Sequence, residues 1–168
     1  MKMIIINGPC GVGKSVLAKK IHKTMPLSFL LALDEISRFI SHYSEYREER
    51  WKLIRALGEA MAKATFSEGR DLIIDKMLYD PILIDAYKTI GEEFGAEVKE
   101  FLIWAPKDVV MGRANDRGYK ENGLLTQEKC EMFWDKIDVL RESRPDVLFV
   151  DTDGLSEEKV FEAVMGML

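Results

Sequence analysis

Short apolar runs alternate with longer stretches in which apolar residues recur at helical spacing. Apolar runs of this length are typical of strands that are buried on both faces, and the helical spacing is typical of helices that cover such strands. The pattern predicts strands at Met3–Ile6, Leu27–Leu33, Asp71–Asp75, Val98–Trp104 and Asp146–Val150.

The helices between these strands are bounded by residues that cap or end helices. Pro26 ends the first helix, and Gly69 lies where a C-cap glycine belongs after the second. The predicted helices run over Ser15–Met25, Glu45–Glu68, Asp80 to Phe94, Asp108–Arg117, Thr126 to Leu140 and Ser156 to Met165. In the second of them we expect one buried stripe, formed by Trp51, Ile54, Leu57, Met61 and Ala64.

Strands that alternate with helices indicate βαβ units with right-handed crossovers. The predicted fold is therefore α/β, a three-layer α/β/α sandwich around a five-stranded parallel sheet. Ligands of such sheets bind at the carboxyl ends of the strands. Polar residues follow four of the predicted strands at this edge: Asn7, Asp34, Asp75 and Asp151-Thr152.

Composition narrows the class of protein. The 168 residues predict a single domain over 1–168, and the 47% hydrophobic and 32% charged content is ordinary for a globular protein. The net charge of -5 argues against a nucleic-acid partner bound by a broad basic face.

Two cysteines, Cys10 and Cys130, give neither a disulfide framework nor metal-ligand spacing, so we expect a reducing cytoplasm. The apolar run near the N-terminus is too short for a signal peptide or a membrane span, so no membrane association is expected.

The segment Gly8–Ser15 fits the phosphate-loop (P-loop) pattern Gly-x-x-x-x-Gly-Lys-Ser/Thr, at a junction between a predicted strand and a predicted helix. The backbone N–H groups of such a loop cradle nucleotide phosphates, assisted by the positive end of the helix. We expect Lys14 to bridge the β- and γ-phosphates and Ser15 to ligate Mg²⁺. The cradle residues are Gly8, Gly11, Val12 and Gly13.

Two acids follow neighbouring strands. Asp34 is placed to accept the proton of an attacking hydroxyl, although an N-cap role for a helix from Glu35 is an alternative. Arg38, one helical turn on, is a candidate clamp for an anionic group of the acceptor, or a surface arginine. Asp75 ends an apolar strand, where an acid orients Mg²⁺ and the substrate. Lys76, next to it, is expected to be solvated.

Arg113 and Arg117 lie four residues apart on one predicted helix that leads into a polar loop. Cationic side chains on a closing segment stabilise the charge that phosphoryl transfer develops, so we predict a lid at 107–125. A solvated charged helix is the alternative. After the last strand, Thr152 is a candidate contact for a base or ribose, and the Asp-Gly pair that follows equally suits a tight turn.

Taken in order, the P-loop, Asp34, the strand ending in Asp75, the two arginines and Asp151-Thr152 resemble small P-loop kinases. The resemblance is to the shikimate kinase, gluconate kinase and chloramphenicol phosphotransferase type and to the AAA_33 group. It implies the sheet order 2-3-1-4-5, ATP and Mg²⁺ as cofactors, activation of an acceptor hydroxyl by Asp34, and contacts of Arg113 and Arg117 with ATP.

The leading hypothesis is an ATP- and Mg²⁺-dependent kinase that phosphorylates a hydroxyl of a small molecule, as a monomer or homodimer. A nucleoside-monophosphate or polynucleotide 5′-kinase and a non-catalytic nucleotide-binding regulator are the alternatives. The Asp-Gly-Phe-Pro-Arg pattern of adenylate kinases is replaced here by Asp75–Tyr79, and the base-reading motif of GTPase switches is absent from the sequence.

Overall fold

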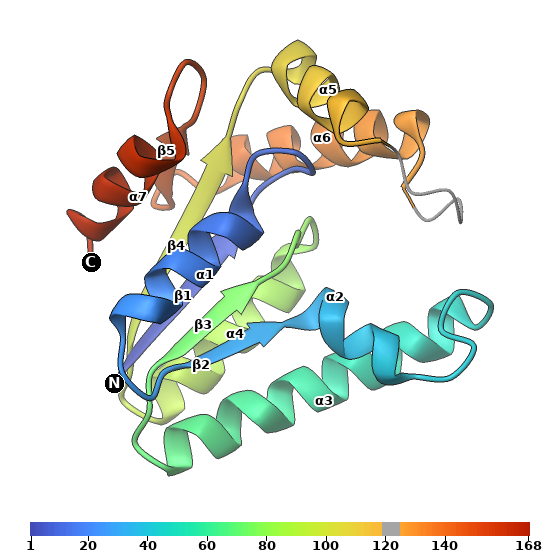
Figure 1. Cartoon of the computed structure of the whole chain (residues 1–168). Coiled ribbons are helices and arrows are strands. Elements are labelled where there is room, and N and C mark those ends of the chain that lie inside the picture. The colour runs from blue at the N-terminus through green and yellow to red at the C-terminus, as the bar shows by residue number, and fades with distance from the viewer. Residues whose placement is uncertain (119–124) are drawn as a thin grey trace.

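The five predicted strands form one parallel sheet in the order β2-β3-β1-β4-β5, with β1 at its centre (Figure 1). The computed structural model describes residues 1–118 and 125–168. The strands are β1 Lys2–Asn7, β2 Phe29–Ala32, β3 Leu72–Asp75, β4 Glu97–Trp104 and β5 Leu148–Asp151. The predicted fold class and the sheet order implied by the family resemblance are therefore confirmed.

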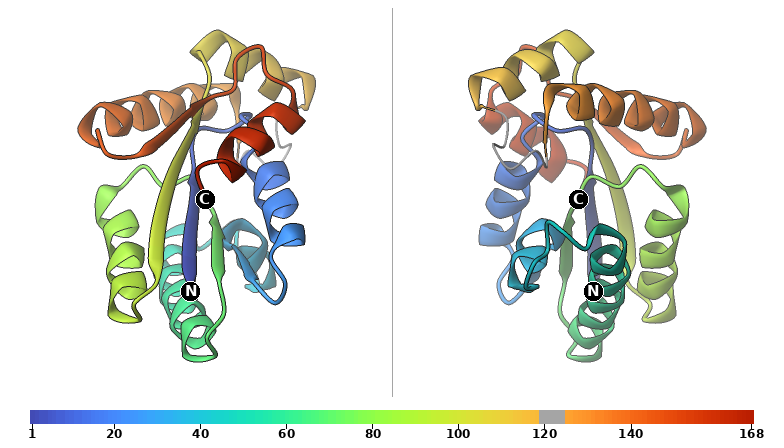
Figure 2. Two further views of the ribbon diagram at one scale, coloured as in Figure 1. Left: turned by 90° about the vertical axis from the view of Figure 1, so that its left-hand side faces the viewer. Right: turned by 90° about the vertical axis from the view of Figure 1, so that its right-hand side faces the viewer.

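Helices cover both faces of this sheet (Figure 2). They are α1 Lys14–Thr24, α2 Leu33–Ile36, α3 Arg47–Ser67, α4 Pro81–Glu93, α5 Lys107–Asp116, α6 Gln127–Ser143 and α7 Glu157–Met165, with a 3-10 helix, η1, at Ser37–Phe39. Because side chains alternate along a strand, Met3 and Ile5 of β1 pack with α3, α4 and α6, whereas Ile4 and Ile6 pack with α1, α5 and α7. The described helices include none with the length and apolar content needed to cross a membrane.

The second strand is shorter than the predicted Leu27–Leu33. Leu27 has a positive φ of 60° within a turn closed by the Ser28 N–H, which donates to the Met25 carbonyl at 3.1 Å. At the other end, the buried Leu33 already belongs to α2. A continuous apolar run does not distinguish a strand from the first turn of a buried helix, which explains the difference.

The predicted buried stripe of α3 is wrong at two positions, because Trp51 and Ala64 are exposed. The side of α3 that faces the core carries Ile54, Gly58, Ala62 and Phe66 instead. A Cβ at Gly58 would collide with the Tyr87 hydroxyl of α4, so this glycine permits the close approach of the two helices. The prediction considered only large apolar side chains, so it overlooked Gly58 and placed the buried stripe on a slightly different side of the helix.

Asn7, at the end of β1, joins two loops at the carboxyl edge of the sheet. Its buried Oδ1 accepts from the N–H groups of Gly8 and Leu78, each at 2.8 Å, and its Nδ2 donates to the Leu78 carbonyl at 2.7 Å. One side chain therefore satisfies buried backbone groups of both the loop after β1 and the loop after β3.

We expect Asn7→Ala to lower the free energy of unfolding by about 2–4 kcal/mol, because it leaves three buried backbone groups without partners. Urea unfolding followed by circular dichroism measures the loss. Ser28→Ala, which removes another nearly buried polar side chain far from these loops, serves as the control. A loss for Asn7→Ala no greater than that of the control would contradict the assigned role.

Candidate active site

The loop Gly8–Ser15 adopts a conformation that depends on glycine. Gly8, Gly11 and Gly13 have positive φ angles of 142°, 84° and 90°. A Cβ at Gly8 would collide with the Ile103 carbonyl oxygen, and one at Gly11 would lie 3.0 Å from the Val110 carbonyl oxygen. The positive φ angles favour glycine at all three positions, and at Gly8 and Gly11 the close backbone contacts add a steric requirement.

Lys14 begins α1 and folds back over its own loop, where its Nζ donates to the Pro9 carbonyl at 2.7 Å. Burial lowers the pKa of its ammonium, against the opposing charges of Asp75 and Asp34. The side chain thus occupies the mouth of the loop with its charge incompletely compensated. An anion that enters the loop would provide the missing counter-charge.

Asp75, Asp34 and Lys76 all lie close enough to Lys14 for their charges to shift its pKa. Asp75 is the last residue of β3, in register with Ile6 of β1 and Ala32 of β2. Because parallel strands end at one edge, the structure brings the predicted acids to the same side of the P-loop.

Lys76 is a residue of this site that sequence reasoning missed. Its side chain is only 7% exposed, and its Nζ donates to Asp34 Oδ1 at 2.5 Å. The same ammonium lies 4.4 Å from the centre of the Trp51 ring, on α3. A lysine is rarely buried without a partner, and here the carboxylate and the aromatic face stabilise its charge.

The signal that could have found Lys76 is its position directly after the acid at the end of β3. At that edge a side chain points into the site rather than into solvent. Trp51 belongs to the same group of contacts, and its exposure of 42% shows that it is not a core residue.

Asp34 and Arg38 differ in their surroundings. Asp34 lies within the first turn of α2, whose N-cap is Ala32, so the alternative N-cap role for Asp34 is wrong. Its carboxylate is 71% exposed while paired with Lys76. Arg38, on η1, pairs instead with the exposed Glu35 at 2.7 Å. In this conformation Arg38 therefore has a surface carboxylate as its partner.

On the other side of the P-loop, Arg113 and Thr152 hold α5 against the loop after β5. The guanidinium donates to Thr152 Oγ1 and to the Thr152 carbonyl, each at 3.0 Å. Thr152 is buried, and its own N–H donates to the Trp104 carbonyl at 2.8 Å. Arg113 therefore positions the loop after β5, a contact that sequence reasoning did not predict.

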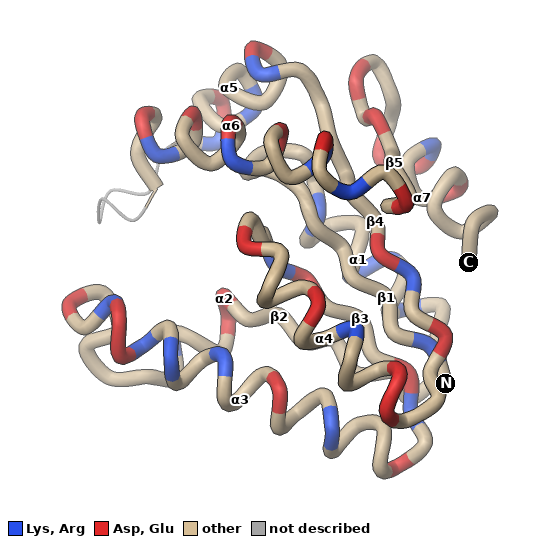
Figure 3. Tube along the Cα trace, turned by 180° about the vertical axis from the view of Figure 1, so that it is seen from behind, with Lys and Arg blue, Asp and Glu red and all other residues tan. Residues whose placement is uncertain are grey.

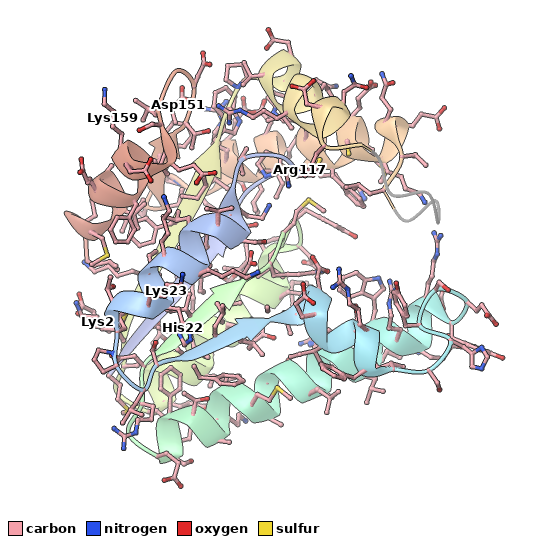
Figure 4. All side chains as sticks on the ribbon, in the orientation of Figure 1. Lys2, His22, Lys23, Arg117, Asp151 and Lys159 are labelled. Atoms are coloured by element: carbon pink, nitrogen blue, oxygen red, sulfur yellow. The ribbon has the colours of Figure 1, made fainter. Side chains whose placement is uncertain are left out.

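A hollow of about 480 Å³ lies beside these residues, between the start of α1, the end of α5 and the loop before α7. Arg117 lies at its edge near the P-loop (Figure 4). The predicted nucleotide-binding residues that line it are Gly11, Val12, Gly13, Arg113, Arg117 and Thr152.

Asp151 Oδ1 accepts from the Asp153 N–H at 2.9 Å, and Gly154 has a φ of 65°. The segment after β5 therefore forms the tight turn that the Asp-Gly pair suggested. Most of the loop inside the predicted lid, residues 119–124, lies outside the described residues. Within the predicted lid the structure describes α5 and the residues flanking that loop.

No cluster of three or more His, Cys, Asp or Glu side chains that could hold a metal ion occurs in 1–118 or 125–168. Ser15, in the first turn of α1, and Asp75, at the end of β3, carry oxygen atoms that can ligate a metal; Ser15 follows Lys14 in the chain, and Asp75 lies close enough to Lys14 for their charges to interact. A pair of this kind fits Mg²⁺ that takes most of its ligands from phosphate oxygens and water, as is usual for nucleotide-bound magnesium.

Several solved structures share this fold across nearly the whole chain. A tunicamycin resistance protein from Deinococcus radiodurans covers 99% of this chain and 95% of its own, with a TM-score of 0.67 and 20% identity. A sugar kinase from Janibacter sp. HTCC2649 covers 99% and 93%, with a TM-score of 0.68 and 18% identity. A deoxyadenosine kinase from M. mycoides, solved with bound dCTP, covers 98% and 97%, with a TM-score of 0.61 and 18% identity.

A search of curated protein sequences gave no significant match. By contrast, the sequence profile of a family described as an AAA domain, AAA_33, matches residues 3–133. The matched range contains the P-loop, Asp34, Asp75, Lys76, Arg113 of α5 and Arg117 directly after α5. With this match and a kinase-like P-loop fold, the chain belongs to the AAA_33 family.

Proposed function

We propose that this protein is an ATP- and Mg²⁺-dependent kinase that transfers the γ-phosphate to a hydroxyl of a small molecule. The observation that carries the proposal is the position of the P-loop between two unlike groups. The hollow with Arg113, Arg117 and Thr152 borders Gly11 and Gly13, whereas Asp34, Asp75 and Lys76 lie close enough to Lys14 for their charges to interact with it. Phosphoryl transfer needs this division into a nucleotide side and an acceptor side.

On the nucleotide side, the P-loop amides and Lys14 would hold the phosphates, and the hollow would take the base and ribose. Its volume of about 480 Å³ lies within the range of small-molecule sites. Arg117 would approach the phosphates, while Arg113 keeps Thr152 and its loop in place. Mg²⁺ held by Ser15 and Asp75 would neutralise phosphate charge.

On the acceptor side, Asp34 would take the proton of the attacking hydroxyl. The hydroxyl oxygen forms a bond to the γ-phosphorus as the bond to the β-γ bridging oxygen breaks, and the nucleoside diphosphate leaves. Lys76 holds the Asp34 carboxylate in one position and contributes positive charge beside it. We assign Lys76 a positioning role because its only described hydrogen bond through Nζ is to Asp34.

Two features favour a small acceptor without a phosphate group. Transfer to a nucleoside monophosphate needs arginines for its phosphate, and Arg38 already pairs with Glu35. Lys and Arg alternate with Asp and Glu along α3 and α6 (Figure 3), which does not favour a long nucleic acid. The structural similarity to a sugar kinase and a deoxyadenosine kinase supports phosphotransfer to a hydroxyl in general.

A screen of acceptors for stimulated ADP release tests the proposal. Sugar acids, nucleosides, nucleoside monophosphates, aminoglycoside-like alcohols and short oligonucleotides are offered with ATP and Mg²⁺. Stimulation by a small hydroxyl compound, with a phosphorylated product seen by mass spectrometry, supports the proposal. Stimulation by nucleoside monophosphates or oligonucleotides alone would replace it with one of the two nucleotide-kinase alternatives.

For Lys14→Ala we expect nucleotide turnover to fall by about 100-fold or more, because the variant loses the cation at the mouth of the P-loop. ADP release measures turnover, and circular dichroism checks that the fold is kept. Lys19→Ala, which removes an exposed lysine from the same helix, is the matched control. If Lys14→Ala had the same turnover as the control, the assignment of this loop as a P-loop would be wrong.

For Asp34→Asn we expect turnover with an acceptor to fall by about 100-fold while nucleotide affinity changes by less than about twofold. Titration with a fluorescent ATP analogue measures the affinity. Glu35→Gln neutralises the neighbouring exposed acid and should leave both quantities unchanged. Equal losses of turnover and affinity in Asp34→Asn would show that Asp34 only supports the local structure.

The combination of Lys76→Met with Asp34→Asn tests the positioning role. If Lys76 acts through Asp34, the double variant should lose no more turnover than Asp34→Asn alone. Independent roles would instead multiply the two losses. Nucleotide affinity and urea unfolding, measured for all three variants, separate this result from a damaged fold.

A further inference from the structure

The only two cysteines of the chain lie against each other, although 120 positions separate them. Cys10 is a half-buried residue of the P-loop, and Cys130 is fully buried in the first half of α6. Cys10 Sγ donates to the Cys130 carbonyl oxygen at 4.0 Å, which places the Cys10 thiol directly against the residue that carries the second thiol. The proposed phosphotransfer uses neither thiol.

The two sulfurs have unlike surroundings. Cys10 is half-buried at the P-loop, so an oxidant in solution can reach its sulfur. Cys130 is fully buried, and burial raises its pKa to about 12, so it remains a protonated thiol. Cys10 is therefore the sulfur placed to react first, with Cys130 beside it.

We propose that Cys10 and Cys130 form a reversible intramolecular disulfide that disables the P-loop. Oxidation of this pair would therefore abolish nucleotide binding. The inference rests on the proposed function only in requiring that the P-loop bind nucleotide phosphates.

A peroxide is the oxidant that the chemistry requires. The Cys10 thiolate attacks one peroxide oxygen, the O–O bond breaks, and Cys10 becomes a sulfenic acid, while the hydroxide that leaves takes up the proton lost by Cys10 and forms water. The Cys130 sulfur then attacks the Cys10 sulfur, the S–O bond breaks, and the S–S bond forms as the proton of Cys130 leaves with the hydroxyl as water. Overall, two thiols and one hydrogen peroxide give one disulfide and two waters.

The disulfide would alter the P-loop because its sulfurs must approach to about 2 Å, closer than two sulfur atoms can come without a covalent bond. The helix α6 resists displacement, since Ile137 and Leu140 anchor it in the core. The loop must therefore yield at Cys10. Its neighbour Gly11 already packs closely against the Val110 carbonyl, so the strain falls on the backbone amides that would hold the phosphates.

The test treats the reduced full-length protein with hydrogen peroxide and follows two quantities. Mass spectrometry should show a species about two mass units lighter, with the peptides of Cys10 and Cys130 linked. Titration with a fluorescent ATP analogue and Mg²⁺ should show at least about tenfold weaker binding by this species, and dithiothreitol should restore the affinity.

Cys10→Ala and Cys130→Ala each remove one partner and are the matched controls. Neither should give the lighter species, and Cys10→Ala should keep its nucleotide affinity after peroxide treatment. A linked protein that still binds nucleotide, or a Cys10 that oxidises to a sulfinic acid without linkage, would overturn the inference. Failure of the reduced protein to bind nucleotide would instead refute the proposed function. Mass spectrometry detects the disulfide whether or not nucleotide binds, so the two failures can be told apart.

Discussion

The Asn7 side chain is the contact on which the geometry of the site depends. It lies at the end of the central strand and binds both Gly8, the first residue of the P-loop, and Leu78, beyond the end of β3. Hydrogen bonds of a buried amide are costly to lose, since water cannot replace them. The loop that would hold phosphates and the segment that carries Asp75 and Lys76 are therefore fixed relative to each other.

Because these two segments are held together, several charged side chains lie close to one another at this edge of the sheet. Lys14 and Lys76 are two cations at the same strand edge, and they repel each other. Asp75 and Asp34 offset this repulsion, Asp34 through a direct ion pair with Lys76. Burial still lowers the pKa of Lys14, so the site favours the entry of an anion. A polyphosphate is an anion whose charge and length suit such a loop.

The sequence predicted the features that follow from local rules. Periodicity placed the five strands, and the glycine spacing placed the P-loop, because both depend on residues near one another in the chain. It missed features that arise from tertiary contacts: the burial of Lys76 against Trp51, the bond from Arg113 to Thr152, and the approach of α3 to α4 at Gly58. The roles of Asp34, Asp75 and Arg117 remain predictions that the geometry accommodates.

The segment after β3 also explains why α6 matters to a site that it does not line directly. Lys76 contacts Trp51 of α3, Leu78 is bound to β1, and Tyr79 stacks on Phe133 of α6 with ring centres 5.7 Å apart. One short segment thus contacts α3, the central strand β1 and α6. Cys130 lies one turn of α6 before Phe133, so the helix that places Cys130 beside the P-loop also supports Tyr79. The segment after β3 and the P-loop therefore both contact α6, which Ile137 and Leu140 anchor in the core.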